Sequence, residues 1–412
     1  MCRNLQKSRS NLSHKTLGRL KQQKIYGGIV MAGAREYIIE FGNTSFEEYP
    51  FCDADALVLC QIFYMPLERV VSSSFDKAPV ALADAANELF NMMGGKYRRL
   101  GLMIPKDASK NIMLMAARRR YADVKIQAVE EVFSINPAIQ YAAGTFILPD
   151  GTAVVVFRGT DDTVSGWKED LDIFIKKGTP AYGYAREYVE KLAEAHKGGI
   201  MLCGHSKGGN IALRTAVTIN KQIRSRITGV YNFDGPGYHS SSVLNTAAYD
   251  EILPVYRHFV PSGSMIGMML AHDYDYQAVA SKMHIGAFQH DLGTWKISGG
   301  ELEKVADTDK LSKLTDLIFA EICSGVDFDF CGALDDVFTS VISGIDKITL
   351  TELASHPLNS LAGGIKAFAD VSPEMKSQAK KAVKGAGGAL KKALGELKNG
   401  EISSITGLLY AK

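Results

Sequence analysis

The stretch that decides the fold is GIMLCGHSKGGNIAL, residues 199–213. A short apolar run is followed at once by a turn of small residues around Ser206 and then by a segment that favours a helix. Gly204 and Gly208 stand two residues before and two after the serine, where only small residues keep such a turn free of clashes. The pattern G-x-S-x-G predicts a nucleophile elbow, which lifts the serine oxygen above a sheet.

Apolar runs and helix-like segments alternate on both sides of this stretch. A turn sequence, Leu148-Pro149-Asp150-Gly151, joins two of the apolar runs and indicates a β-hairpin. The alternation predicts an α/β fold with a mostly parallel central sheet and helices on both faces, in which chemistry gathers at the carboxyl ends of the strands. The predicted elements are strands at 138–147, 152–157, 199–203, 227–233 and 254–260, and helices at 184–195 and 207–220.

The length of 412 residues favours one main domain with extensions. We place the catalytic domain at 31–300, with a helical part at about 45–137, and a helical C-terminal extension at 301–412. Residues 1–30 have only basic charged residues and no apolar signal core, which favours a disordered tail. A transit peptide, or a true start at the methionine that follows this tail, are the alternatives.

The overall composition limits the classes of partner and cofactor that the protein is expected to bind. A formal net charge of +2 gives no general attraction to nucleic acid. Six cysteines without C-x-x-C spacing indicate a reduced, cytoplasmic protein with no zinc site, and no other cofactor motif is present. No apolar run reaches the roughly 20 residues of a membrane-spanning helix. A lysine-rich amphipathic segment begins at Ser372, and such a segment can make weak contact with an anionic membrane surface. The simpler interpretation is a helix that packs on its own domain.

A serine at an elbow needs a histidine to take its proton and an acid to orient that histidine. Chain order and polar neighbours favour His290 as the base, within GAFQHDL at 286–292. His284 is the nearest rival. His258 lies inside an apolar strand, where a structural histidine with hydrogen-bond partners is expected.

Asp234 is the favoured acid because it ends the strand that follows the elbow helix. The simpler interpretation is an aspartate that stabilises the turn DGPG at 234–237. Asp273, Asp275 and Asp291 remain alternatives.

An oxyanion that forms during attack by serine needs two backbone donors. Elbow geometry assigns one to the N–H of Lys207, and a residue at the end of the strand Phe157-Arg158-Gly159-Thr160 can supply the other. The Thr160 hydroxyl can add a further donor. We expect a loop from Asp161 to Pro180 beside the site.

Four ordered motifs together resemble one known family. They are RGTDDT with GWKED at 158–163 and 166–170, GHSKGGN at 204–210, YNFDGPG at 231–237 and QHD at 289–291. These motifs are similar to those of the Mbeg1-like family, also called DUF2974, and more distantly to class 3 lipases of the α/β-hydrolase superfamily. The resemblance covers roughly 46–295.

The resemblance implies an α/β-hydrolase fold with Ser206 as nucleophile, His290 as base, and Thr160 and Lys207 at the oxyanion hole. Class 3 lipases usually take their acid from the next strand, where this chain has Ser262 and Ser264, so Asp234 would be an acid in an earlier position. The leading hypothesis is a serine hydrolase that cleaves a carboxylic ester, small or lipidic. The alternative is a non-catalytic binding or signalling protein with the same fold.

Overall fold

The computed structural model describes residues 33–316, with gaps at 98–100, 102–103, 136, 162, 176–177, 239–242, 273–274, 285, 311 and 314. The basic tail predicted at 1–30 lies outside the described residues. So do most of the extension predicted at 301–412 and the whole lysine-rich segment that begins at Ser372.

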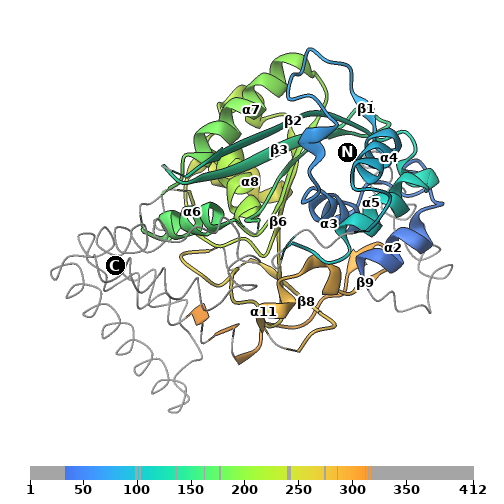
Figure 1. Cartoon of the computed structure of the whole chain (residues 1–412). Coiled ribbons are helices and arrows are strands. Elements are labelled where there is room, and N and C mark those ends of the chain that lie inside the picture. The colour runs from blue at the N-terminus through green and yellow to red at the C-terminus, as the bar shows by residue number, and fades with distance from the viewer. Residues whose placement is uncertain are drawn as a thin grey trace, which may run out of the picture.

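The core of the protein is an eight-stranded sheet whose spatial order follows the chain from β1 to β8 (Figure 1). Neighbouring strands are antiparallel from β1 to β4 and parallel from β4 to β8. The strands are β1 (Val80–Ala81), β2 (Lys125–Ser134), β3 (Ile139–Ile147), β4 (Ala153–Phe157), β5 (Ile200–His205), β6 (Ile227–Phe233), β7 (Tyr256–Pro261) and β8 (Gln277–Val279). The mostly parallel sheet of an α/β fold is confirmed, as is the hairpin formed by β3 and β4.

Helices and short strands complete the described chain. The α-helices are α2 (Ala34–Phe41), α3 (Asp53–Ile62), α4 (Leu82–Met92), α5 (Ala108–Ala116), α6 (Val164–Ile175), α7 (Ala181–Ala195), α8 (Lys207–Thr218), α9 (Lys221–Arg224), α10 (Ala247–Ile252) and α11 (Gly286–Gln289). The 3₁₀ turns are η1 (Leu67–Arg69), η2 (Arg119–Tyr121), η3 (Leu253–Val255) and η4 (Leu292–Thr294). A separate two-stranded sheet pairs β9 (Ile297–Ser298) with β10 (Glu301–Leu302).

Alternation along the buried strands places a hydrophobic core on each face of the sheet. Val154 and Val156 of β4 belong to the core formed with α2 to α5, whereas Val155 and Phe157 belong to the core formed with α7 and α8. Figure 1 shows α3 to α5 on one side of the sheet and α7 and α8 on the other. Both faces are therefore covered, as the run of apolar residues in β4 predicts.

Two segments differ from the sequence predictions. The segment predicted to be helical, about 45–137, also contributes β1 and β2 to the sheet. A bulge between Gln127 and Glu130, with Ala128 at φ 54°, interrupts the alternation of β2 and hides its period of two residues. The expected loop from Asp161 to Pro180 is wrong, since it contains helix α6. The described buried positions of α6 hold polar residues together with Ile173, and this mixture obscures the helical pattern; the polar residues are Ser165, Lys168, Glu169 and Asp172.

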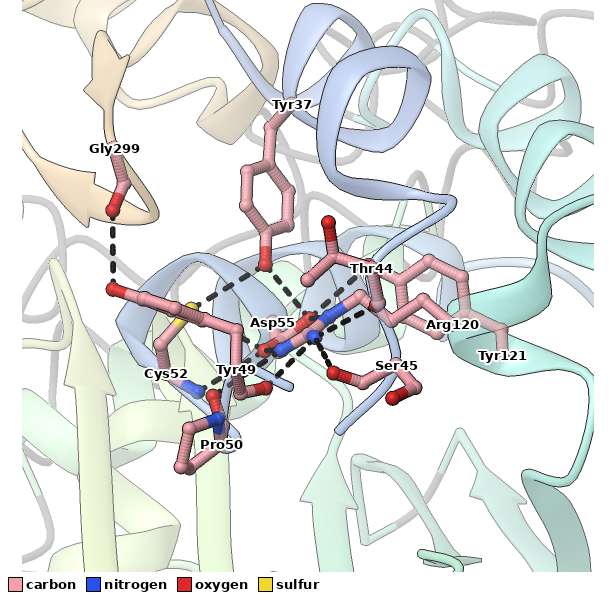
Figure 2. A network of polar contacts seen from close by, with 10 residues as sticks. All are labelled: Tyr37, Thr44, Ser45, Tyr49, Pro50, Cys52, Asp55, Arg120, Tyr121 and Gly299. Carbon is pink, nitrogen blue, oxygen red and sulfur yellow. Dashed lines mark hydrogen bonds and ion pairs between the residues drawn. The ribbon is translucent and has the colours of Figure 1, made fainter. Parts of the chain in front are cut away.

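A buried ion pair joins the segments that precede the main strands (Figure 2). The Arg120 guanidinium donates to both oxygens of Asp55, with Nη2 at 2.5 Å and Nε at 2.8 Å, and neither side chain is more than 1% exposed. The hydroxyls of Tyr37 and Tyr121 also donate to Asp55. The remaining guanidinium hydrogens reach the backbone carbonyls of Thr44, Ser45, Tyr49 and Pro50. This dense set of partners compensates for the burial of both charges.

Candidate active site

The turn between β5 and α8 has the geometry of a nucleophile elbow. Ser206 adopts φ 56° and ψ −130°, a strained conformation for a residue with a side chain. A Cβ at Gly204 would overlap with the backbone of Gly208, and a Cβ at Gly208 would overlap with the Phe157 carbonyl. Both glycines are thus required by close backbone contacts, and the serine stands at the carboxyl edge of the parallel strands.

Asp234 and His290 are brought together at this edge. His290 Nδ1 lies 2.7 Å from Asp234 Oδ2, and the aspartate side chain is 1% exposed. The other carboxylate oxygen, Oδ1, accepts from the Ser264 hydroxyl and from the Gly267 N–H at 3.1 Å. Because the carboxylate can only accept, Nδ1 carries the imidazole proton and Nε2 is left as a base.

Ser264 is one of the two serines at the position where the resemblance to lipases would place an acid. Its side chain donates to Asp234, so this position supports the aspartate instead of replacing it. Ser262, two residues earlier, donates to Gln289 at 3.3 Å and does not contact the carboxylate. Asp234 thus lies between Ser264 and His290, with one carboxylate oxygen toward each.

The described residues provide no hydrogen bond to the Ser206 hydroxyl, so a Ser206–His290 hydrogen bond is not formed in this conformation. His205, which precedes the serine, does contact the histidine. Its ring lies 4.4 Å from the His290 ring between centroids, and its Nε2 lies 2.9 Å from the His290 backbone oxygen. The dyad therefore lies beside the elbow, although the base does not hydrogen-bond to the serine in this conformation.

Tyr64 completes the surroundings of His205. The tyrosine hydroxyl lies 2.8 Å from His205 Nδ1, and burial, assisted by the charge of His290, lowers the pKa of His205 well below its ordinary value. His205 is therefore neutral at physiological pH, with Nε2–H donating to the His290 carbonyl and Nδ1 accepting from Tyr64. Neither tyrosine nor histidine was predicted to take part in this arrangement.

Thr160 follows β4, and Lys207 is the first residue of α8. Lys207 occupies the first turn of α8, where a backbone N–H has no partner within its helix. The hydroxyl of Thr160 donates to Asp170, at 2.7 and 2.6 Å from the two carboxylate oxygens. Because that hydroxyl has only one hydrogen, the expected third oxyanion donor is already engaged with Asp170. The two backbone N–H groups remain as candidates.

Burial raises the pKa of Asp170 to about 6, although the positive charge of Lys207 and the hydrogen bond from Thr160 both act to lower it. The Lys207 side chain is itself buried and pairs with Glu169, the residue before Asp170. Glu169 and Asp170 belong to the GWKED motif at 166–170, and the sequence did not predict a role in the site for either residue. The feature of the sequence that points to such a role is the lysine directly after the predicted nucleophile, because a buried ammonium group needs a carboxylate partner.

Asn210 links α8 to the turn after Asp234. Its side-chain amide is buried and donates to the carbonyls of Pro236 at 3.0 Å and Gly237 at 2.8 Å, while Tyr182 donates to its oxygen at 2.7 Å. Helix α8, which begins directly after Ser206, therefore also fixes the turn that follows Asp234.

The alternative bases and acids lie elsewhere. His284 is exposed, whereas His258 is buried with neither ring nitrogen bonded within the described chain, so the expected hydrogen-bonded histidine is wrong. Asp291 caps η4 by accepting from the Gly293 N–H. Asp273 lies outside the described residues. Asp275 is described and has an interaction partner, but no contact with His290 is found.

The described part of the chain lacks two further features. No cluster of three or more histidine, cysteine, aspartate or glutamate side chains there could hold a metal ion. No helix in this part combines the length and the apolar character that crossing a membrane demands.

The fold and site together define an α/β protein with an elbow serine and an Asp–His pair at the carboxyl ends of its parallel strands. The model of the Mbeg1-like family matches residues 115–328, which is more than half of the chain. The protein belongs to this family. Neither the curated proteins nor the solved structures contain a match.

Proposed function

We propose that the protein is a serine hydrolase of the α/β-hydrolase kind that cleaves carboxylic esters through an acyl-enzyme on Ser206. The observation that carries this proposal is the 2.7 Å contact between His290 Nδ1 and buried Asp234, placed beside a serine on a strained elbow. Structural turns alone do not require a carboxylate, an imidazole and a strained serine to meet at one sheet edge.

In the proposed reaction, His290 Nε2 takes the hydroxyl proton of Ser206 as the oxygen attacks the ester carbonyl carbon. The negative charge on the carbonyl oxygen is stabilised by the backbone N–H groups of Lys207 and Thr160. His290 then gives its proton to the departing alcohol. Water repeats the sequence on the acyl-enzyme, and the carboxylic acid leaves with Ser206 regenerated.

Asp234 has two tasks in this proposal. It holds the proton of His290 on Nδ1, so that Nε2 faces the nucleophile, and its charge stabilises the imidazolium that forms during attack. The bonds from Ser264 and Gly267 keep the carboxylate in place. This arrangement supports an acid at the strand end of β6 instead of the following strand.

An apolar substrate is favoured by the surroundings of the base. Phe288, two residues before His290, exposes 58% of its surface although it is aromatic. We propose that this exposed ring contacts the acyl or alcohol part of an ester. We therefore propose esterase or lipase-like activity with a preference for apolar groups.

A fluorophosphonate probe tests the proposal on the full-length chain. We expect labelling of the wild type and none of Ser206→Ala, with His290→Ala labelled far more slowly. Ser165→Ala serves as the matched control, because this serine donates to the Ser134 carbonyl and has no place in the reaction. A series of nitrophenyl esters of rising acyl length then measures the preferred substrate. Equal labelling of wild type and Ser206→Ala would contradict the proposal.

The second candidate is a binding or signalling protein that retains the elbow without catalysis. It is favoured by the missing hydrogen bond between Ser206 and His290 in this conformation. Absence of both labelling and ester turnover, in a wild-type sample shown to be folded, would support this candidate.

A further inference from the structure

The side chain of Lys207, the residue after the proposed nucleophile, is fully enclosed. Only 1% of it is exposed, and its ammonium nitrogen Nζ lies 2.6 Å from the Glu169 carboxylate. The same nitrogen donates to the backbone oxygen of Gln140 at 2.7 Å and to its side-chain oxygen at 2.8 Å. These three bonds use all three ammonium hydrogens. The position of Lys207 is thus determined by charged and polar contacts on all sides.

Glu169 is the centre of this group of contacts. Its side chain is 0% exposed, and besides Lys207 it accepts from the Gln140 N–H at 2.9 Å and from the Thr179 hydroxyl. The carboxylate therefore connects helix α6 to the first residues of β3, to the segment before α7 and to the start of α8. Each of these elements is fixed relative to the others by one buried group.

The next residue of α6 holds the opposite side of the proposed oxyanion hole. Asp170 accepts the hydroxyl hydrogen of Thr160, and Glu169 accepts from Lys207. Two consecutive residues of one helix thus hold the two residues whose backbone N–H groups are the proposed oxyanion donors. Donors of this kind contribute only when they are already aimed at the place where charge develops.

We propose that Glu169 is a positioning residue for the reaction of Ser206, acting through its ion pair with Lys207 to hold the first backbone N–H of α8. This inference rests on the proposed function. A buried ion pair is often no more stabilising than apolar side chains of similar size, because both charges lose their hydration. In this proposal, the Lys207–Glu169 ion pair stands directly after the serine because it holds a backbone N–H in place at the oxyanion hole.

The principal test is the double variant Lys207→Met/Glu169→Gln. Lys207→Met alone would leave a buried carboxylate without its cation, which favours unfolding, whereas the double variant removes both charges and keeps the side-chain lengths. Steady-state turnover of a short nitrophenyl ester gives kcat and KM, and fluorophosphonate labelling gives the rate of attack by Ser206. Thermal unfolding establishes that each variant is folded.

We expect kcat and the labelling rate of the double variant to fall about 10- to 100-fold, with KM within about twofold, because misplaced donors weaken binding of the transition state and not of the substrate. Glu169→Gln alone keeps an acceptor oxygen for Lys207 and should lose less. A purely structural role would lower the unfolding temperature without moving kcat of the folded protein.

The matched control is the double variant Arg120→Met/Asp55→Asn, which removes another buried ion pair on a different set of elements. It should lose stability and keep wild-type kcat in its folded fraction. If folded Lys207→Met/Glu169→Gln and Glu169→Gln both keep wild-type kcat and labelling rate, the positioning role is overturned while the hydrolase proposal stands. If the wild type itself neither turns over esters nor reacts with the probe, the hydrolase proposal fails, and this inference fails with it.

Discussion

Asp234 and His290 lie 2.7 Å apart, carboxylate oxygen to Nδ1, although 56 residues separate them in the chain. The aspartate directly follows β6 and the histidine follows α11, so the contact depends on the correct assembly of the last three parallel strands. The carboxylate is almost completely buried, and two further donors hold its other oxygen.

Asp234→Asn should lower kcat about 10³- to 10⁴-fold with little change in fold, because an amide in this place can donate to Nδ1 and so stabilise the wrong histidine tautomer. Turnover of a nitrophenyl ester by purified protein measures this loss. Ser264→Ala is the graded control: it removes one donor to the carboxylate and should cost far less. A kcat for Asp234→Asn equal to that of the wild type would contradict the role of Asp234 as the acid.

Tyr64→Phe should reduce the free energy of unfolding by about 1–3 kcal/mol, because it leaves the buried Nδ1 of His205 without its donor. A smaller second effect is expected on kcat, since His205 in turn contacts the His290 carbonyl. Urea unfolding measures the first effect and ester turnover the second. The control is Tyr49→Phe, whose hydroxyl donates to the Gly299 carbonyl away from the proposed site; it should leave kcat unchanged.

Asp55→Asn should cost about 3–5 kcal/mol of stability, since it leaves the buried Arg120 guanidinium without its counter-ion. Glu48→Gln breaks the exposed pair with Arg119 and should cost much less, because solvent screens these charges. Chemical denaturation of the two variants side by side measures the difference. Equal losses would show that burial does not govern the strength of these pairs.

His258 should make a contribution to stability that is lost as the pH is lowered from about 6.5 toward about 3, whereas Asp170, whose pKa is raised to about 6, acts in the opposite direction. Burial lowers the pKa of His258 to about 3, with the charge of His272 acting in the same direction and that of Asp234 opposing it. The unfolded chain therefore binds a proton at this histidine well before the folded chain does, which lowers the free energy of unfolding by about 1.4 kcal/mol per pH unit in that window.

His258→Phe should make this acid dependence shallower but not remove it, because buried His205 also has a lowered pKa and acts with the same sign. His284→Gln is the control, since this histidine is exposed. Urea unfolding at several pH values between 4.5 and 7 measures the slopes. An unchanged slope in His258→Phe would contradict the assignment.

Sequence alone was sufficient for the parts of the fold that carry local signals. The apolar run before Ser206, the two glycines around it and the turn at 148–151 each specify their own backbone, and the elements predicted there were found within a few residues of their observed ends. β2 was missed because its bulge breaks the alternation on which strand prediction depends.

The residues of the candidate site also fall into those that the sequence could predict and those that it could not. Asp234 and His290 could be proposed because chain order and strand ends narrow the choice before any contact is known. Glu169, Asp170 and Tyr64 could not, since their partners are defined by how α6 and the segment after α3 pack against the elbow. A polar residue in a buried position looks like a surface residue until its partner is placed.

The sheet order, in which every strand pairs with the one made just before it, has a consequence for synthesis on the ribosome. Each new strand finds its template already in place, so the sheet can grow from one edge to the other as the chain emerges. His290 follows the last of these strands and is the final member of the proposed machinery to be synthesised. A nascent chain released before that residue would present a finished elbow with no partner for its serine.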